Sequence, residues 1–327
     1  MPRSAAGHFD ADWLDAAAAL ADRARPLSRP NPGVGAIVVA RGRVISRGWT
    51  QGGGRPHAEA VALDAAGAAA RGATLYVTLE PCAHRSARGP SCTSLVLASG
   101  ISRVVVGCED PDPRTAGTGI AALRQAGITV DVLPSEYAKA SLAGYLIRAT
   151  ARRPHITLKL ATSLDGCIAL ADGTSKWITG PEARAHAHLE RARGDAILVG
   201  GGTLRADSPR LDVRLAGLED RSPQRFVLTR GAAPEGWTAV SYPTAPDAFG
   251  DAQYLMVEGG AGAAAAFLRA DLVDRLLLYR APIVIGGGLP SVGDIGLAAL
   301  DTAHGCWRLT DTRRLGSDRL EAYERTR

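Results

Sequence analysis

Three possible metal ligands and a glutamate place the strongest constraint on this fold, because ligands distant in sequence must meet in space. His57-Ala-Glu59 is followed by Pro81-Cys82 and then by Cys92. His57, Cys82 and Cys92 can hold one Zn²⁺ and leave a fourth position for water, whose pKa zinc lowers toward ~7. Glu59 need not bind metal and can move protons as the catalytic acid/base. The pattern predicts a zinc-dependent deaminase site.

Each of these residues also has an ordinary structural interpretation, since a single free cysteine is usually a small buried hydrophobe. Their placement favours a site. The segments 57–70 and 90–99 are typical of helices, the segment 73–79 of a strand, and Cys92 falls where the second helix opens. The ligands are therefore expected at strand-to-helix junctions, where helix N-termini favour thiolates. The segment between the cysteines, 83–91, is longer than the two residues of the general signature.

Length and composition predict a two-domain protein of the cytoplasm. A chain of 327 residues exceeds one ordinary core. Its five cysteines form no compact framework of pairs, which favours a reducing compartment. We see no apolar run of the ~20 residues that a membrane helix needs and no secretory signal pattern, so no membrane association is expected.

The net charge of +5 has two possible meanings. It is compatible with nucleic-acid binding, but the arginines are scattered and aromatic residues make up only 5% of the chain. Neither a basic stripe nor a stacking platform is visible. Phosphorylated small molecules explain scattered arginines equally well. We therefore expect small-molecule substrates and no nucleic-acid partner.

The first half, residues 1–150, alternates strands and helices and predicts a three-layer α/β/α domain with a mixed sheet. A turn at Arg41-Gly42 joins the first two strands into a hairpin, and Arg152-Arg153-Pro154 marks the boundary to the second half. Helices are expected at 9–25, 57–70, 90–99, 117–126 and 135–149, and strands at 34–40, 44–48, 73–79, 103–107 and 128–133.

The second half, residues 151–327, starts its own alternation. Strands are expected at 155–161, 195–200, 224–229, 253–257, 274–280, 283–285, 305–310 and 318–323, with helices at 181–193 and 262–270. Trp177 by itself is most simply a core residue of a hairpin, and 203–207 is expected to be a charged loop.

Three glycine clusters in this half suggest a nucleotide site. They are 200–202, 259–262 and 286–288, and each follows a β-rich run. Glycine-rich turns let backbone N–H groups approach a phosphate, although one such turn alone is weak evidence. No G-x-G-x-x-G opens a βαβ unit, so the Rossmann fingerprint is absent. A dinucleotide would have to be held by another fold.

Taken together, the motifs closely resemble the bifunctional riboflavin-biosynthesis deaminase/reductase family, over nearly the whole chain. They are Asn31-Pro32 before Val34-Gly35-Ala36, His57-Ala58-Glu59, Thr78-Leu-Glu-Pro-Cys82, Asp110-Pro111-Asp112-Pro113, Leu158-Lys159, Ser163-Leu-Asp-Gly166, Ser175-Lys-Trp-Ile-Thr179, Thr203 to Asp207, and Val257-Glu-Gly-Gly260. The resemblance implies an α/β fold in each half, with a cytidine-deaminase-like N-terminal domain and a dihydrofolate-reductase-like C-terminal domain.

The resemblance also implies two reactions. The first is hydrolytic deamination of 2,5-diamino-6-ribosylamino-4(3H)-pyrimidinone 5′-phosphate, and the second is NADPH-dependent reduction of its ribosyl group to ribityl. By motif, the residues lining the deaminase substrate pocket are Asn31, His84, Asp110 and Asp112. Those holding the reductase substrate are Lys159, Ser175, Arg191, Leu211, Arg214 and Glu258. Those contacting NADPH are Ala161, Thr162, Trp177, Thr203, Asp207, Gly259 and Gly260.

Two segments depart from the family pattern and leave the roles of Arg88 and Arg230 open. Arg88-Gly89-Pro90-Ser91 stands where the family usually has Lys-Thr-Pro-Pro, and Thr229-Arg230 where an acidic residue and serine are common. Lys159 is expected either to be compensated by ligand or Asp207, or to reach the surface from a strand end.

Two other hypotheses remain at this stage. One is a nucleic-acid base deaminase with a non-catalytic C-terminal binding domain. The other treats the second half as a scaffold for oligomerisation. A homo-oligomer is possible under each hypothesis.

Overall fold

The computed structural model describes residues 5–84, 87–243 and 247–327. The chain divides into two compact units, Met1–Arg152 and Arg153–Arg327, each with its own sheet and hydrophobic core.

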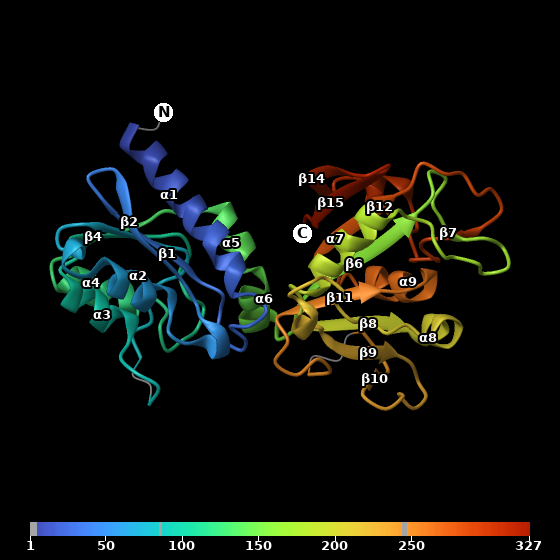
Figure 1. Cartoon of the computed structure of the whole chain (residues 1–327), viewed down its shortest axis with the longest axis horizontal. Helices are drawn as coiled ribbons and strands as arrows, with labels where there is room; N and C mark the ends of the chain where they lie inside the picture. The colour runs from blue at the N-terminus through green and yellow to red at the C-terminus, as the bar shows by residue number, and fades with distance from the viewer. Residues whose placement is uncertain (1–4, 85–86, 244–246) are drawn as a thin grey trace. The chain divides into compact units, whose positions relative to one another are not determined.

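The first unit is built on a mixed sheet with the strand order β2-β1-β3-β4-β5 (Figure 1). β1 runs antiparallel to both β2 and β3, whereas β3, β4 and β5 are parallel. Arg41 and Gly42 both have positive φ in the tight turn between β1 and β2, as the predicted hairpin requires. The strands are β1 (Gly35–Ala40), β2 (Arg43–Trp49), β3 (Thr74–Val77), β4 (Arg103–Val106) and β5 (Thr129–Val132).

Helices cover both faces of this sheet, which confirms the predicted three layers. The helices are α1 (Ala5–Ala21), α2 (Ala58–Ala66), α3 (Cys92–Ser99), α4 (Thr118–Gln125), α5 (Glu136–Ser141) and α6 (Ala143–Ala151). α1 and α5 lie on one face, and α2, α3 and α4 on the other (Figure 1). Successive strand residues alternate between the layers: Val38 and Val104 pack toward α2 and α3, whereas Ile37 and Val105 pack toward α1.

The second unit is built on an eight-stranded sheet, counted over the described residues, with the order β10-β9-β8-β11-β6-β12-β15-β14. Its first six strands in that order are parallel, and β15 and β14 are antiparallel additions at one edge. The strands are β6 (His155–Thr162), β8 (Ala196–Gly200), β9 (Gln224–Leu228), β10 (Thr238–Val240), β11 (Tyr254–Glu258), β12 (Arg275–Arg280), β14 (Trp307–Leu315) and β15 (Asp318–Arg325).

The helices of this unit are α7 (Pro181–Arg191), α8 (Gly201–Asp207) and α9 (Ala261–Arg269). α7 and α9 pack on the sheet through separate core clusters. Phe267 of α9 packs on Leu158 and Leu198, whereas Ala183 and Ala187 of α7 pack on the other face. A separate ribbon pairs β7 (Cys167–Ala169) with β13 (Leu289–Pro290).

Several predicted elements differ from the structure. The single helix expected at 135–149 is interrupted at Leu142, which has ψ near 1° and places its side chain in the core. The strand expected at 283–285 is absent, and Ile283 and Val284 are exposed rather than buried against a partner. The segment 203–207, expected as a loop, lies in α8. β7, β10 and β13 are short and were not predicted.

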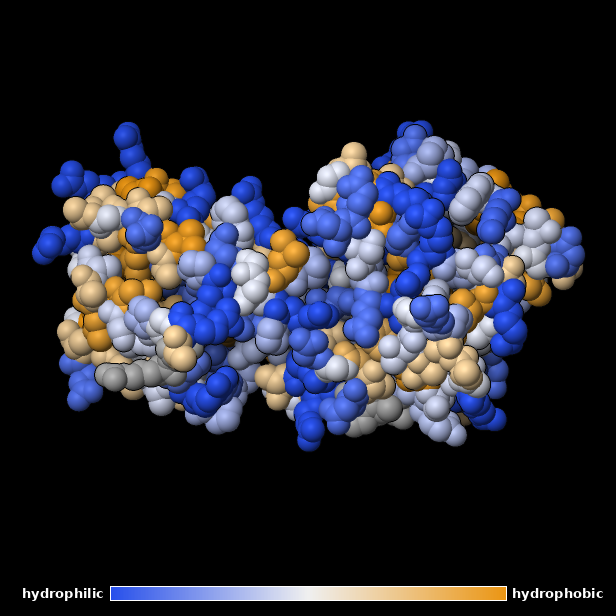
Figure 2. All heavy atoms as spheres, turned by 60° about the horizontal axis from the view of Figure 1, so that its bottom comes forward, coloured by the Kyte–Doolittle hydropathy of each residue, from blue (hydrophilic) through white to orange (hydrophobic). Residues whose placement is uncertain are grey.

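No helix within the described residues is long and apolar enough to cross a membrane. The face in Figure 2 is largely hydrophilic, with hydrophobic residues in smaller separate areas.

Candidate active sites

His57, Cys82 and Cys92 come together in the first unit, as their sequence pattern predicts. Their ligand atoms all lie within 4.8 Å of one another. Nδ1 of His57 lies 3.2 Å from Sγ of Cys92 and 3.6 Å from Sγ of Cys82. One imidazole nitrogen and two sulfurs form a donor set that zinc uses in proteins, so these residues fit that metal.

Local structure explains why the three side chains converge. His57 is the N-cap of α2, and Cys92 is the first residue of α3, behind the N-cap Ser91. Ser91 Oγ accepts a hydrogen bond from the backbone N–H of Ser94, which fixes the start of α3. Cys82 follows β3, and its sulfur accepts a hydrogen bond of 3.3 Å from the backbone N–H of Cys92. A helix N-terminus therefore supports negative charge on sulfur here.

The two thiols have opposite pKa shifts because they share a hydrogen bond. Donation by the thiol of Cys92 holds the pKa of Cys82 well below its usual range. The same hydrogen bond, together with burial, raises the pKa of Cys92. Binding of zinc would displace any proton shared between the two sulfurs.

Glu59 stands beside this cluster in the first turn of α2 and is 3% exposed. Burial raises its pKa to about 7. A carboxyl group with such a pKa can both accept and release a proton near neutral pH, which is the property required of an acid/base residue.

A cavity of about 370 Å³ adjoins the cluster, and His57, Glu59 and Cys82 line it. The four residues predicted for the deaminase substrate pocket, Asn31, His84, Asp110 and Asp112, also line it. The amide nitrogen of Asn31 lies 3.2 Å from Nε2 of His57. His84 Nδ1 lies 3.3 Å from the hydroxyl of Thr115. The structure brings these residues together, while their contacts with substrate stay a prediction.

The buried carboxylate of Glu80 organises one wall of the cavity, a role that the sequence did not reveal. Its Oε1 accepts backbone hydrogen bonds from Gly119 and Ile120, at 3.0 and 3.1 Å. Its Oε2 accepts from Gly117 and Asp110, at 3.0 and 3.3 Å. Glu80 thereby fixes the loop that carries Asp110 to the start of α4. The Thr78-Leu-Glu-Pro-Cys82 motif contained this residue but gave no sign of its partners.

Three arginines and a tyrosine also line the cavity: Arg55, Arg88, Arg114 and Tyr145. Arg88 donates a hydrogen bond of 2.6 Å to the carbonyl of Gly53. Arg114 pairs with Asp112, which lies on the same loop. The lining thus combines three arginines with the carboxyl groups of Glu59, Glu80, Asp110 and Asp112, and its arginines can pair with an anionic group on a ligand.

In the second unit, Lys159, Arg191 and Glu258 form one charged cluster. Arg191 binds Glu258 through two hydrogen bonds of 2.6 and 2.9 Å, and Nζ of Lys159 lies 3.7 Å from the same carboxylate. Burial by itself would raise the pKa of Glu258, but the two cations lower it to about 2. The cluster combines residues of β6, α7 and β11.

This cluster corrects the expectation for Lys159. Among the described residues, Lys159 forms its ion pair with Glu258 and not with Asp207. Asp207 lies instead 3.9 Å from Lys176. The register explains the difference, because Lys159 on β6 stands directly opposite Glu258 on the parallel strand β11.

Arg214 and Leu211 lie on the loop that follows α8. Arg214 binds Asp212 at 2.5 Å, and its backbone N–H donates to Nδ1 of His188 on α7. Arg191 donates to the carbonyl of Asp212, so the loop is joined to the charged cluster. Leu211 has a positive φ and a side chain that is 4% exposed in the core. Its side chain therefore packs inside the protein, so substrate contact would have to come from its backbone.

Five of the seven predicted cofactor residues lie at or just beyond the carboxyl ends of the neighbouring strands β6, β8 and β11: Ala161, Thr162, Thr203, Gly259 and Gly260. Gly259 and Gly260 follow β11 directly after Glu258, and the hydroxyl of Thr203 accepts a hydrogen bond of 3.1 Å from the N–H of Gly260. Gly259 is needed sterically, because a Cβ there would lie 2.8 Å from that of Ala263. Parallel sheets bind ligands at such carboxyl ends. Of the remaining predicted residues, Thr162 is buried and Ala161 and Ser175 are partly buried.

Trp177 is 65% exposed and stacks with the guanidinium of Arg184, 4.7 Å from its ring centroid. The interpretation of this ring as a core residue is wrong, because no cluster of buried side chains encloses it among the described residues. An exposed aromatic ring suits a ligand contact equally well.

The third glycine cluster does not follow a strand as expected. Its Gly286 N–H, with that of Ile285, donates to the carboxylate of Asp165. The hydroxyl of Ser163 and these backbone donors lower the pKa of Asp165 to about 2. The cluster is therefore held against the Ser163-Leu-Asp-Gly166 turn, a contact that the sequence did not indicate.

Two family profiles match the chain. The cytidine and deoxycytidylate deaminase zinc-binding region matches residues 8–108, and the RibD C-terminal domain matches residues 154–239 and 250–320. The predicted folds, cytidine-deaminase-like in the first unit and dihydrofolate-reductase-like in the second, are thereby confirmed.

Full-length relatives match as well. The riboflavin biosynthesis protein RibD of Aquifex aeolicus is 36% identical over 97% of this chain and 99% of its own length. The structure of Acinetobacter baumannii RibD has a TM-score of 0.84 and 32% identity, and covers 98% of this chain and 99% of its own. A Thermotoga maritima structure, a diaminohydroxyphosphoribosylaminopyrimidine deaminase/5-amino-6-(5-phosphoribosylamino)uracil reductase, has a TM-score of 0.83 and 30% identity, with the same coverage.

These matches span both units in the same order, which supports the two-step enzyme over the nucleic-acid and scaffold hypotheses. The chain belongs to the RibD family, the bifunctional deaminase/reductases of riboflavin biosynthesis.

Proposed function

We propose that the first unit deaminates 2,5-diamino-6-ribosylamino-4(3H)-pyrimidinone 5′-phosphate and that the second reduces the ribosyl group of the product to ribityl with NADPH. Support comes from the Thermotoga maritima relative, which is named for this deaminase and this reductase activity. Three arginines in the lining of the first cavity can pair with the phosphate of such a substrate.

In the deaminase, Zn²⁺ bound by His57, Cys82 and Cys92 would supply a water of lowered pKa. Glu59 would transfer the two protons of the attacking water one at a time, the first to the ring nitrogen and the second to the amino group that leaves as ammonia. Its pKa of about 7 allows it both to accept and to release a proton near neutral pH. Asp110, Asp112, Asn31 and His84 orient the pyrimidine and its sugar in the cavity.

In the reductase, NADPH would supply the hydride. Lys159 and Arg191 hold the substrate together with Glu258, whose charge keeps both cations in place before substrate arrives. Arg214 would take the substrate phosphate with Arg191. Thr203, Asp207, Trp177 and the backbone of Gly259 and Gly260 would position NADPH at the adjoining strand ends.

A cytoplasmic location is part of the same proposal. All five cysteines are free, including the two zinc ligands, and thiols of this kind persist in a reducing compartment. Homo-oligomer formation stays a prediction.

The observation that carries the proposal is the placement of Glu59 and the His57, Cys82 and Cys92 cluster on one cavity together with the pocket residues. The test supplies the diaminopyrimidine phosphate to the zinc-loaded chain, with and without NADPH, and identifies products by mass. Without NADPH, we expect an amino group to be replaced by oxygen. With NADPH, we expect that product to gain two hydrogens. Recovery of unchanged substrate from zinc-loaded protein would refute the proposal.

A further inference from the structure

Tyr145 lies on α6, a helix that carries none of the predicted pocket residues, and its side chain contacts the deaminase cavity. Its side chain is partly buried and lines the cavity. The phenolic hydroxyl donates a hydrogen bond of 2.7 Å to Oδ1 of Asp110. This contact joins two residues that lie 35 positions apart in the sequence.

The carboxylate of Asp110 is held at one oxygen. Oδ1 accepts from Tyr145 and also, at 2.9 Å, from the backbone N–H of Asp112. Within the part of the chain that the structure describes, no hydrogen bond reaches Oδ2 of Asp110. The residue is 8% exposed and lines the cavity. One oxygen is thus fixed by the protein, and the second is left for an N–H or O–H donor of a ligand.

The charge on Asp110 depends on these donors. Burial raises the pKa of Asp110, and the hydrogen bonds from the Asp112 backbone and from Tyr145 oppose that rise because they stabilise the ionised form. The titratable and charged groups facing Asp110 are Tyr145 on α6, Glu80 after β3, and Cys108, Asp112 and Arg114 on its own loop.

We propose that Tyr145 is a positioning residue of the deaminase: it holds Oδ1 of Asp110 and orients the carboxylate, so that Oδ2 can accept a hydrogen bond from the pyrimidine substrate. This inference rests on the proposed deaminase function and adds to it a residue from the last helix of the first unit. Tyr145 acts through Asp110 and takes no part in proton transfer.

The test is the Tyr145→Phe variant of the full, zinc-loaded chain, which removes the hydroxyl and keeps the ring. We expect KM for the diaminopyrimidine phosphate to rise about tenfold with a much smaller change in kcat, because a hydrogen bond to a charged group is lost from the binding site. Without this donor the pKa of Asp110 rises further. The acid limb of the kcat/KM profile should therefore move to higher pH, while zinc content and reductase activity stay unchanged.

A matched control is available in the same unit. The hydroxyl of Tyr76 donates to Asp10 at 2.6 Å, away from the residues that line the cavity. Tyr76→Phe loses the same kind of hydrogen bond, so it measures the purely structural effect. We expect it to alter neither KM nor the acid limb.

A double-mutant cycle gives a second, independent readout. Asp110→Asn removes the charge that Tyr145 supports, so adding Tyr145→Phe to Asp110→Asn should raise KM by less than twofold. A tenfold effect of Tyr145→Phe in both backgrounds would overturn the proposal. So would an unchanged KM and acid limb in Tyr145→Phe when the wild-type chain deaminates the substrate. Absence of deamination by the wild-type chain would instead refute the proposed function.

Discussion

The carboxyl of Glu59 lies two residues after His57, yet the start of α2 gives the two side chains different surroundings. His57 faces the two sulfurs, whereas Glu59 is buried beside them on the cavity. The proposed metal ligand and the proposed proton carrier can therefore be separated by mutation.

Glu59→Gln should retain zinc and lose deamination by ~2–4 orders of magnitude, the range for a positioned proton-transfer group. The measurements are zinc content and single-substrate turnover. Glu109→Gln changes an exposed glutamate of the same unit and serves as the control. Normal turnover by zinc-loaded Glu59→Gln protein would contradict the assigned role.

In the second unit, the role of Lys159 in reduction can likewise be tested separately from its role in folding. Its ammonium is held by Glu258, which Arg191 also neutralises, so the buried carboxylate keeps a partner when Lys159 is removed. Lys159→Ala should therefore fold and abolish NADPH oxidation with the deaminated substrate, while deamination persists. Arg269→Ala, an exposed charge change on α9, is the control. Retained reduction, or loss of both activities in soluble and zinc-loaded protein, would rule out this division of roles.

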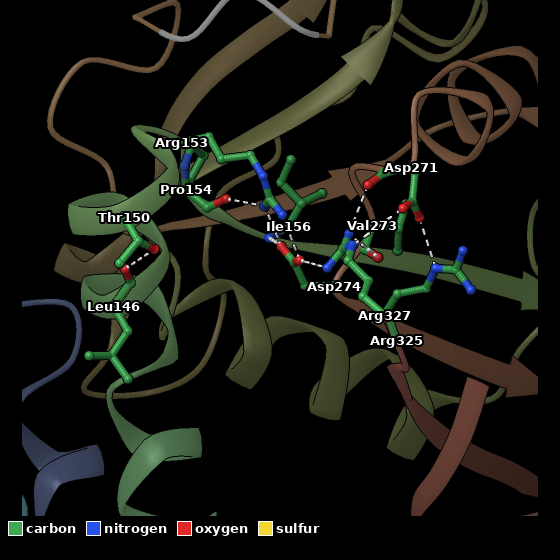
Figure 3. A network of polar contacts seen from close by, with 10 residues as sticks. All are labelled: Leu146, Thr150, Arg153, Pro154, Ile156, Asp271, Val273, Asp274, Arg325 and Arg327. Atoms are coloured by element: carbon green, nitrogen blue, oxygen red, sulfur yellow. Dashed lines mark hydrogen bonds and ion pairs between the residues drawn. The ribbon is translucent and has the colours of Figure 1, made fainter. Parts of the chain in front are cut away.

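At the scale of elements, Asp274 joins the first strand of the reductase unit to its last (Figure 3). It precedes β12, and its carboxylate accepts two hydrogen bonds from Arg153, one from the backbone of Ile156 on β6 and one from Arg327 after β15. Burial would raise the pKa of Asp274, but Arg153 and the other donors lower it. The neighbouring Asp271 binds Arg325 and Arg327 at the surface.

Asp274→Asn should lower the free energy of unfolding of this unit by about 2–4 kcal/mol, because Arg153 and Arg327 lose a buried counter-charge. The partial exposure of Arg327 to water limits this cost. Asp271→Asn, at a side chain that is 53% exposed rather than 5%, should cost less than ~1 kcal/mol. Amide hydrogen exchange of β6 and β12 measures both. Equal protection in the two variants would contradict the expected ranking.

The contribution of Asp274 to stability should depend on pH. Since the pKa of Asp274 is lower in the folded state, its contribution is fully present above the unfolded value of about 3.8 and is lost as the pH falls toward the folded value. The difference between wild type and Asp274→Asn should therefore shrink below pH ~4. A difference that grows on acidification would reverse the sign of the assigned shift.

At the scale of the whole molecule, two sites of unlike chemistry belong to separate units with separate cores. Because the described residues assigned to each site all come from a single unit, two chains that each lack one activity should complement each other. A mixture of Glu59→Gln and Lys159→Ala chains should convert the diaminopyrimidine phosphate to the reduced product after a lag. Either variant alone should stop before or after deamination. No reduced product from a mixture in which each chain keeps its remaining activity would contradict independent sites.

The sequence by itself determined the chemistry of the zinc cluster and most of the elements around it. Ligand type is a property of single residues, and helix and strand periodicity is local, so His57, Cys82, Cys92 and the strand-to-helix junctions could be predicted. It also placed the family motifs of the second half in order. The prediction of a loop at 203–207 was wrong, because α8 begins with two glycines, which are typical of turns rather than of helices.

Tertiary structure alone decided which side chains meet. Glu258 rather than Asp207 compensates Lys159 because the parallel register sets β6 beside β11, and register depends on the whole sheet. Tyr145 reaches Asp110 because α6 packs near the loop after β4, and Glu80 collects four backbone donors that no motif signals. Periodicity specifies which face of an element is buried, whereas a hydrogen-bond partner depends on the packing of elements distant in the chain.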